Sequence, residues 1–87
     1  MRRDPAALWR TAPGFLVLGR ADREPITVTG PGADIWRLLA ADPSLDALVV
    51  TLSDRYGADP AVVRADVEAL LDRLIEAGFV VRGDADE

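Results

Sequence analysis

The sequence predicts an α+β domain in which a three-stranded antiparallel sheet is followed by three helices. Two observations carry this prediction. The front of the chain holds short β-rich runs separated by glycine- and proline-containing turns, and the remainder holds apolar residues at the 3.6-residue period of helices. Eighty-seven residues suffice for one domain with a single modest core. We therefore expect one domain over residues 1–87, with an ordered core at about 8–82 and an acidic tail at 83–87.

Three segments have the character of strands. Residues 8–11 are short and aromatic, and a Pro-Gly pair marks a turn before the apolar run at 15–18. A polar, glycine-bearing stretch at 19–24 is expected to be a hairpin loop. Residues 25–29 then form the third expected strand.

The third expected strand alternates apolar and polar side chains. Ile26 and Val28 share one face of it, and Thr27 and Thr29 share the other. Pro25 has no N–H to donate to a neighbouring strand, so it favours a place at the edge of the sheet.

Each expected helix has its own start signal. The first has Thr29 or Gly30 as its cap, carries a proline in its first turn and runs to about Ala41. The second begins with Asp42 as an oxygen-bearing cap followed by a proline, and it ends at Gly57. The third begins in the same way at Asp59 and ends before a glycine.

The third helix has a wide apolar face. Its expected core line consists of four residues spaced three or four apart: Val63, Val67, Leu70 and Leu74. Leu71 and Ile75 lie outside the centre of this line. The apolar residues 79–81 are expected to close the domain as a short strand or a strap over the core.

These features together suggest a binding groove. If the third strand is an exposed edge beside Leu71 and Ile75, backbone groups line one wall of the groove and apolar side chains line the other. An extended peptide can add itself there as another strand. The alternative, equally compatible with the periodicity, is that Leu71 and Ile75 complete the core.

The composition excludes several kinds of chemistry. The chain has no Cys and no His, and all ten of its basic residues are Arg. A disulfide framework, a cysteine or histidine metal site, a histidine-activated nucleophile and a Schiff-base lysine are therefore excluded. An enzyme is the least expected class, and we expect no cofactor and no metal.

The charge disfavours nucleic acid as a partner. The net charge is −5 and the arginines are scattered along the chain, whereas binding phosphates needs clustered cations. The second and third helices resemble a helix-turn-helix in shape, so a winged-helix transcription regulator or a protein-interaction domain remains the alternative. No apolar run is long enough for a membrane helix or a secretory signal, so we expect a cytoplasmic protein without a membrane partner.

The order of elements resembles the PqqD-like family, the recognition elements of pathways that make ribosomally synthesised, post-translationally modified peptides. The resemblance runs from about Trp9 to Arg82. It is carried by three groups of residues: Gly30-Pro31-Gly32-Ala33 before Ile35, Trp36, Leu38 and Leu39; Arg55-Tyr56-Gly57; and Val67, Leu70, Leu71, Leu74 and Ala77-Gly78-Phe79.

The resemblance implies a non-catalytic, winged-helix-like domain that binds the leader part of a precursor peptide. The leader would lie along the third strand and against the third helix. The implied binding residues are Ile26, Thr27, Val28 and Thr29 on the strand and Arg64, Val67, Glu68, Leu71, Asp72 and Ile75 on the helix. The implied partners are the leader peptidase and cyclase of a lasso-peptide pathway, or the radical enzyme of a PQQ-type pathway.

Overall fold

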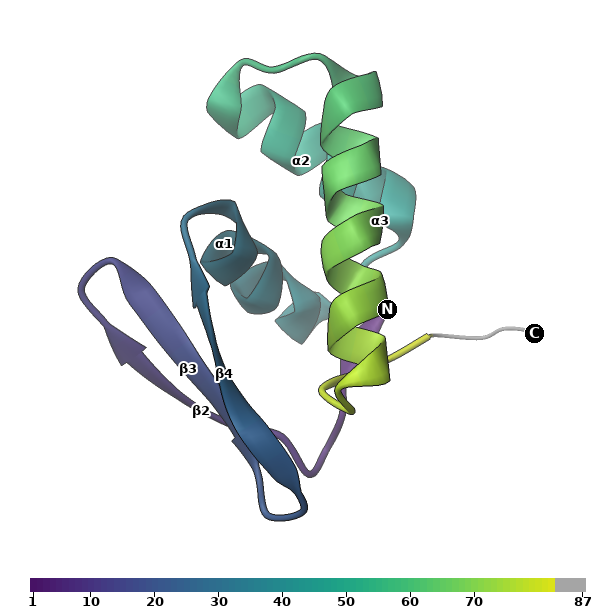
Figure 1. The fold of residues 1–87 in the computed structure, drawn as a ribbon. Helices are drawn as coiled ribbons and strands as arrows, with labels where there is room; N and C mark the ends of the chain where they lie inside the picture. The colour runs from purple at the N-terminus through teal and green to yellow at the C-terminus, as the bar shows by residue number, and fades with distance from the viewer. Residues whose placement is uncertain (83–87) are drawn as a thin grey trace.

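The computed structural model describes residues 1–82, and the expected acidic tail at 83–87 lies outside them. A three-stranded antiparallel sheet forms one side of the molecule, in the order β2–β3–β4. Its strands are Leu8–Ala12, Phe15–Arg20 and Arg23–Thr29. Three helices follow it in the chain (Figure 1). The predicted α+β fold class is confirmed.

The sheet extends further into the β3–β4 connection than the sequence predicts. The loop expected at 19–24 shrinks to a turn at 21–22, because both flanking arginines belong to the strands. Arg20 donates hydrogen bonds to Asp22 at 2.9 Å and to the carbonyl oxygen of Gly78 at 2.6 Å. These bonds tie the end of the hairpin to the segment that follows the last helix.

The helices begin and end close to the residues that the sequence indicates. Their bounds are Pro31–Leu38 for α1, Leu45–Tyr56 for α2 and Pro60–Glu76 for α3. Asp59 caps α3, because its carboxylate accepts a hydrogen bond from the N–H of Ala61 at 2.9 Å. Gly57 ends α2 in the left-handed region, with φ at 61°.

The start of α2 differs from the prediction. Its cap is Ser44, not Asp42, because the Ser44 hydroxyl accepts a hydrogen bond from the N–H of Ala47 at 3.1 Å. Asp42 instead follows a 3₁₀ turn, η1 (Leu39–Ala41), with φ at 52°. A residue before a proline avoids right-handed helical conformation, so the chain leaves the helix before Pro43, and α2 begins two residues after this proline, at Leu45.

Two short strands join the two ends of the described chain. β1 (Arg2–Arg3) pairs antiparallel with β5 (Val80–Val81). β5 is the short strand expected after the third helix, whereas β1 was not expected. Arg3 holds β1 in place: its guanidinium donates to the carbonyl oxygen of Trp36 at 2.7 and 3.0 Å and lies 4.4 Å from the ring centre of Trp9.

The core lies between the inner face of the sheet and the helices. On α3 the buried residues are Val67, Leu71 and Leu74. The expected core line is therefore only partly right: Leu71, placed outside its centre, is 1% exposed, whereas Val63 and Leu70 are only partly buried. The physical reason is that Met1 and Leu45 pack against the core on the side of α3 that carries Leu71. Nothing in the periodicity of α3 alone indicates this packing.

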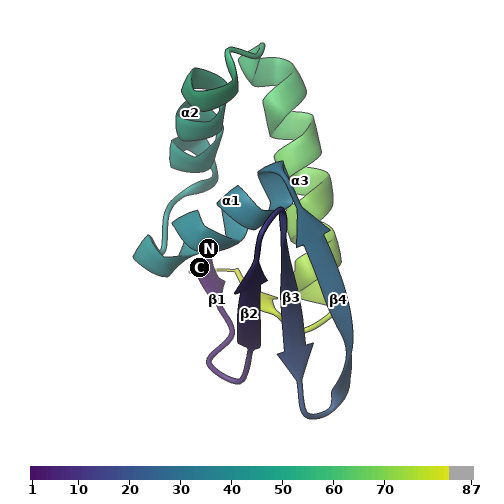
Figure 2. The same ribbon diagram turned by 90° about the vertical axis from the view of Figure 1, so that its left-hand side faces the viewer.

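β4 lies at the edge of the sheet that is nearest to α3, and α1 follows directly from it (Figures 1 and 2). Within residues 1–82, β4 pairs with β3 and with no other strand. The edge position predicted from Pro25 is confirmed. Across the same residues, no helix is long and apolar enough to cross a membrane.

Candidate functional site

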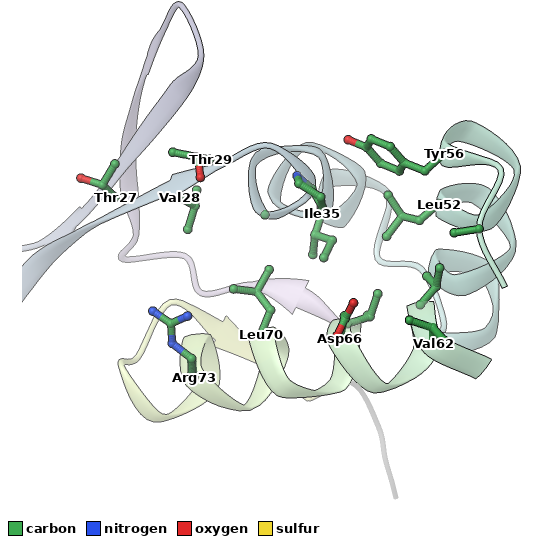
Figure 3. Close-up of a pocket in the computed structure, with 15 residues that line it drawn as sticks. Thr27, Val28, Thr29, Ile35, Leu52, Tyr56, Val62, Asp66, Leu70 and Arg73 are labelled. Carbon is green, nitrogen blue, oxygen red and sulfur yellow. The ribbon is translucent and has the colours of Figure 1, made fainter. Parts of the chain in front are cut away.

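A groove of about 540 Å³ lies between β4 and α3, and α1 and α2 close one end of it (Figure 3). Residues 27–29 of β4 form one wall, and one stripe of α3 forms the other. The lining is largely apolar, with threonine hydroxyls on the β4 side. Such a concave, apolar surface with few polar groups is typical of binding sites.

The first wall is the free edge of β4. Val28 is buried with its side chain in the core, whereas Thr27 and Thr29 are exposed. Because β4 bonds to β3 on one side only, its other row of backbone N–H and C=O groups has no strand partner in the described part of the chain. An unpaired row of this kind is a template for an added strand.

The floor of the groove depends on a glycine. An added Cβ at Gly32 would lie 3.3 Å from the Cβ of Val28 and 3.5 Å from a Cδ of Leu70. The missing side chain therefore lets α1 pack closely against β4 and α3 and leaves the space between the two walls open. Gly32 is itself buried at the start of α1.

The second wall is a stripe along α3 made of residues three or four apart: Val63, Asp66, Leu70 and Arg73. Leu70 lies between the two charged residues and points toward Val28 across the groove (Figure 3). Asp66 lies toward the closed end and Arg73 toward the open end of the groove (Figure 3).

The closed end of the groove is formed by α2 and held by a hydrogen bond. The Tyr56 hydroxyl donates to the carboxylate of Asp34, and Arg37 and Arg55 each lie 3.4 Å from the same carboxylate. The hydrogen bond to Asp34, with partial burial and the negative charge of Asp34, raises the pKa of Tyr56 above its ordinary value of about 10. The ring is thereby placed beside Leu52 at the end of the groove (Figure 3).

The structure brings some of the predicted binding residues together. Four of them line the groove: Thr27, Val28, Thr29 and Val67. Ile26 lines a shallow depression that shares Arg73 with the groove. The predicted binding residues on β4 thus line the groove or the depression next to it.

The other five predicted residues lie away from the groove lining: Arg64, Glu68, Leu71, Asp72 and Ile75. Arg64 forms an ion pair with Asp46 on α2, and Asp72 forms one with Arg82 at 3.0 Å. Leu71 belongs to the core and Ile75 packs against it. The cause is the packing of the N-terminal residues and α2, which turns this flank of α3 away from β4.

Sequence reasoning missed the stripe of α3 that does face β4. The usable signal was the charge pattern, since Asp66 and Arg73 flank Leu70 on that stripe and charged side chains rarely face a core. The closed end, with Leu52 and Tyr56 from α2, had no local signal. Its position depends on how α2 packs against α1 and α3.

The groove can bind a ligand through backbone and apolar contacts. Its wall offers main-chain groups in an extended row, and its interior offers aliphatic side chains with one carboxylate and one guanidinium. Among residues 1–82, no group of three or more carboxylates stands close enough together to hold a metal ion. The arrangement suits an extended polypeptide.

Comparison with known families decides the relationship of this chain. The profile of the family described as coenzyme PQQ synthesis protein D (PqqD) matches residues 16–80, which is well over half of the chain. This chain belongs to the PqqD family. The matched region of the PqqD profile runs from β3 to β5 and includes both walls of the groove.

The fold of this PqqD-family chain is also similar to a solved structure. That structure is described as TbiB1 in complex with the TbiA(beta) leader peptide. The two share 22% sequence identity with a TM-score of 0.83, over 99% of this chain and 100% of the other. At that identity the similarity concerns the fold. A search of curated protein sequences finds no significant match.

Proposed function

We propose that this chain recognises the leader segment of a ribosomally synthesised precursor peptide and presents it to the enzymes that modify that peptide. The observation that carries the proposal is the unpaired edge of β4 opening onto an apolar groove. Membership of the PqqD family supports it, as does the fold shared with TbiB1, which was solved with a leader peptide.

The leader binds as an added strand on β4. Main-chain hydrogen bonds along residues 27–29 supply affinity with little dependence on sequence, and alternate side chains of the leader enter the groove over Val67 and Leu70. Each large apolar side chain that is buried contributes roughly 1.5–3 kcal/mol. Two such anchors with the ladder hydrogen bonds suffice for binding at about micromolar concentration after the costs of association.

Partner enzymes carry out the chemical modification of the precursor peptide. The groove supplies threonine hydroxyls, the Asp66 carboxylate and the Arg73 guanidinium, which suit the binding of a peptide. The partners are a leader peptidase and a cyclase, as in lasso-peptide pathways, or a radical enzyme, as in PQQ-type pathways. Recognition takes place in the cytoplasm, where the ribosome makes the precursor.

No observation favours the alternative of a DNA-binding regulator. The exposed face of α3 includes Glu68, Asp72 and Glu76, and acidic side chains repel a phosphate backbone. A gel shift at low salt should show no complex with duplex DNA.

The deciding experiment measures binding of the labelled leader peptide encoded by the neighbouring precursor gene. Fluorescence anisotropy should give a Kd of about one micromolar or lower. A set of leaders, each N-methylated at one backbone position, then tests strand addition. Because alternate N–H groups of a strand face one neighbour, methylation should weaken binding about tenfold or more at every second position and have little effect between them.

Two results would contradict the proposal. The first is the absence of leader binding at tens of micromolar protein. The matched control in the same titration is the Leu70→Glu variant, which places a charge inside the groove. The second is a uniform response to N-methylation along the leader, since only strand pairing produces an alternating pattern.

A further inference from the structure

The groove has a charge pattern that strand addition alone does not require. Asp66 and Arg73 are the charged residues of its lining, and they have opposite signs. Within residues 1–82, neither forms an ion pair with another side chain of the protein. By contrast, Arg64 and Asp72 on the other flank of α3 are each paired with an oppositely charged side chain.

The two charges lie on the same stripe of α3, on either side of Leu70. They are seven residues apart on α3, which is two helical turns or about 10.5 Å along the axis. Leu70 lies between them and faces Val28 (Figure 3). From Asp66 to Arg73, the α3 wall of the groove therefore carries a negative, an apolar and a positive side chain in that order.

We propose that this wall selects leaders by charge: the bound strand places a basic side chain opposite Asp66, an apolar side chain over Leu70 and an acidic side chain opposite Arg73. The inference rests on the proposed function, because it assumes that a peptide binds here as a strand. It names a property of the ligand that the edge of β4 does not determine.

The spacing of a strand fits this pattern. Side chains on one face of a strand recur every second residue, about 6.7 Å apart, so three successive ones span about 13 Å. That length exceeds the 10.5 Å between the helical positions by only a few ångströms, which long charged side chains can close. The selected strand therefore has opposite charges at positions i and i+4 with an apolar residue at i+2.

The order of the two charges depends on the direction of the strand. A strand antiparallel to β4 enters from the side to which the Thr29 end of β4 leads, which is the closed end with Asp66, so its basic residue comes first (Figure 3). A parallel strand has its acidic residue first. Either order satisfies the proposal, and the observed order reports the direction of binding.

The test begins with a display library of random twelve-residue peptides, selected on the purified chain at physiological salt. Selection against the Leu70→Glu variant removes peptides that bind elsewhere on the surface. We expect the remaining peptides to carry an apolar residue flanked at two residues on either side by opposite charges.

Variants of the two charged residues give the quantitative test. Asp66→Asn and Arg73→Gln should each weaken a selected peptide about fivefold, as expected for a partly exposed ion pair. The loss should vanish when the matching charge of the peptide is replaced by Gln. Arg64→Gln and Asp72→Asn serve as controls on the far flank of α3 and should leave the affinity unchanged.

The outcomes separate the two proposals. If every selected peptide binds the wild type and Leu70→Glu equally, peptide recognition in the groove itself fails. If groove-dependent peptides are obtained but lack the opposite charges, or if the double variant Asp66→Asn/Arg73→Gln binds them as well as the wild type does, strand addition stands and the charge selection is overturned.

Discussion

Tyr56 is the single residue that reports most directly on the closed end of the groove. Its hydrogen bond to Asp34 raises its pKa, so the folded state holds the phenolic proton more tightly than the unfolded state does. This contribution to stability is complete below a pH of about 10 and is lost as the pH rises through the raised pKa. Because the chain contains one tyrosine, its ultraviolet absorbance titrates this group alone.

Replacing the acceptor tests this assignment. Asp34→Asn removes the hydrogen-bonding carboxylate and its charge, so the pKa of Tyr56 should fall toward its ordinary value in an absorbance titration. Asp46→Asn, which removes a carboxylate that pairs with Arg64 instead, is the matched control. An unchanged midpoint in Asp34→Asn would show that Tyr56 and Asp34 are not hydrogen-bonded in solution.

Gly32 governs the floor of the groove. In Gly32→Ala the new methyl group would stand 3.3 Å from the Cβ of Val28, which is crowded but can be relieved by a small shift. Alanine favours a helix over glycine by up to about 1 kcal/mol, so the free energy of unfolding should change little. Leader binding should weaken several-fold in anisotropy titrations, because the methyl group fills the space between β4 and Leu70.

Gly19→Ala provides the control for this substitution. Gly19 lies in β3 with no heavy atom within 4 Å of its added Cβ, so leader binding should not change. Equal affinity of Gly32→Ala and the wild type would mean that the bound strand does not reach the floor.

At the scale of elements, the two flanks of α3 have different roles. Leu70→Ala removes an apolar contact in the groove and should weaken leader binding about tenfold, equivalent to about 1.4 kcal/mol. Ile75→Ala removes a partly buried side chain that packs against the core, so it should lower the free energy of unfolding and leave affinity unchanged. Anisotropy and urea unfolding on both variants distinguish these effects, and the reverse result would place the leader on the other flank.

Arg3 attaches β1 to α1, in addition to the pairing of β1 with β5. Arg3 donates two hydrogen bonds to the carbonyl oxygen of Trp36 and lies over the rings of Trp9 and Trp36. Arg3→Ala should lower the free energy of unfolding by roughly 2 kcal/mol, from the lost charged hydrogen bonds and cation–π contacts. Urea unfolding followed by circular dichroism measures this loss.

The neighbouring arginine is the control for this prediction. Arg2 is exposed, so Arg2→Ala should change the free energy of unfolding by less than about 0.5 kcal/mol. Arg3→Lys should recover only part of the stability, because an ammonium group lacks the planar fork that bonds Trp36. Equal effects of Arg2→Ala and Arg3→Ala would contradict the assigned role of Arg3.

Across the whole molecule, the features that could be predicted are those with local causes. The cap at Asp59, the stop at Gly57 and the edge position indicated by Pro25 depend on the residues themselves and their near neighbours, so the order of elements followed from the sequence. The pairing of β1 with β5 joins residues from opposite ends of the described chain, and no local sequence pattern predicts it.

The same distinction between local and distant causes applies to the residues of the candidate site. Thr27 to Thr29 were predictable because strand alternation and a proline mark an edge. The flank of α3 was not, because both Leu70 and Leu71 fit the apolar face. Which of them is buried depends on other elements, such as Met1 and Leu45, which pack against the core that contains Leu71. Periodicity gives the width of an apolar face, whereas neighbouring elements decide which part of that face remains open.

The pairing of β1 with β5 has a practical consequence for building with this domain. Arg2 and Val81 are paired residues, and Met1 and Arg82 line the same depression on the flank of α3 that faces away from the groove. A tag, a surface anchor or a second polypeptide joined at residue 1 or at residue 82 therefore emerges behind α3. Immobilisation through either position should leave the groove accessible, so one attachment scheme serves binding measurements and fusions alike.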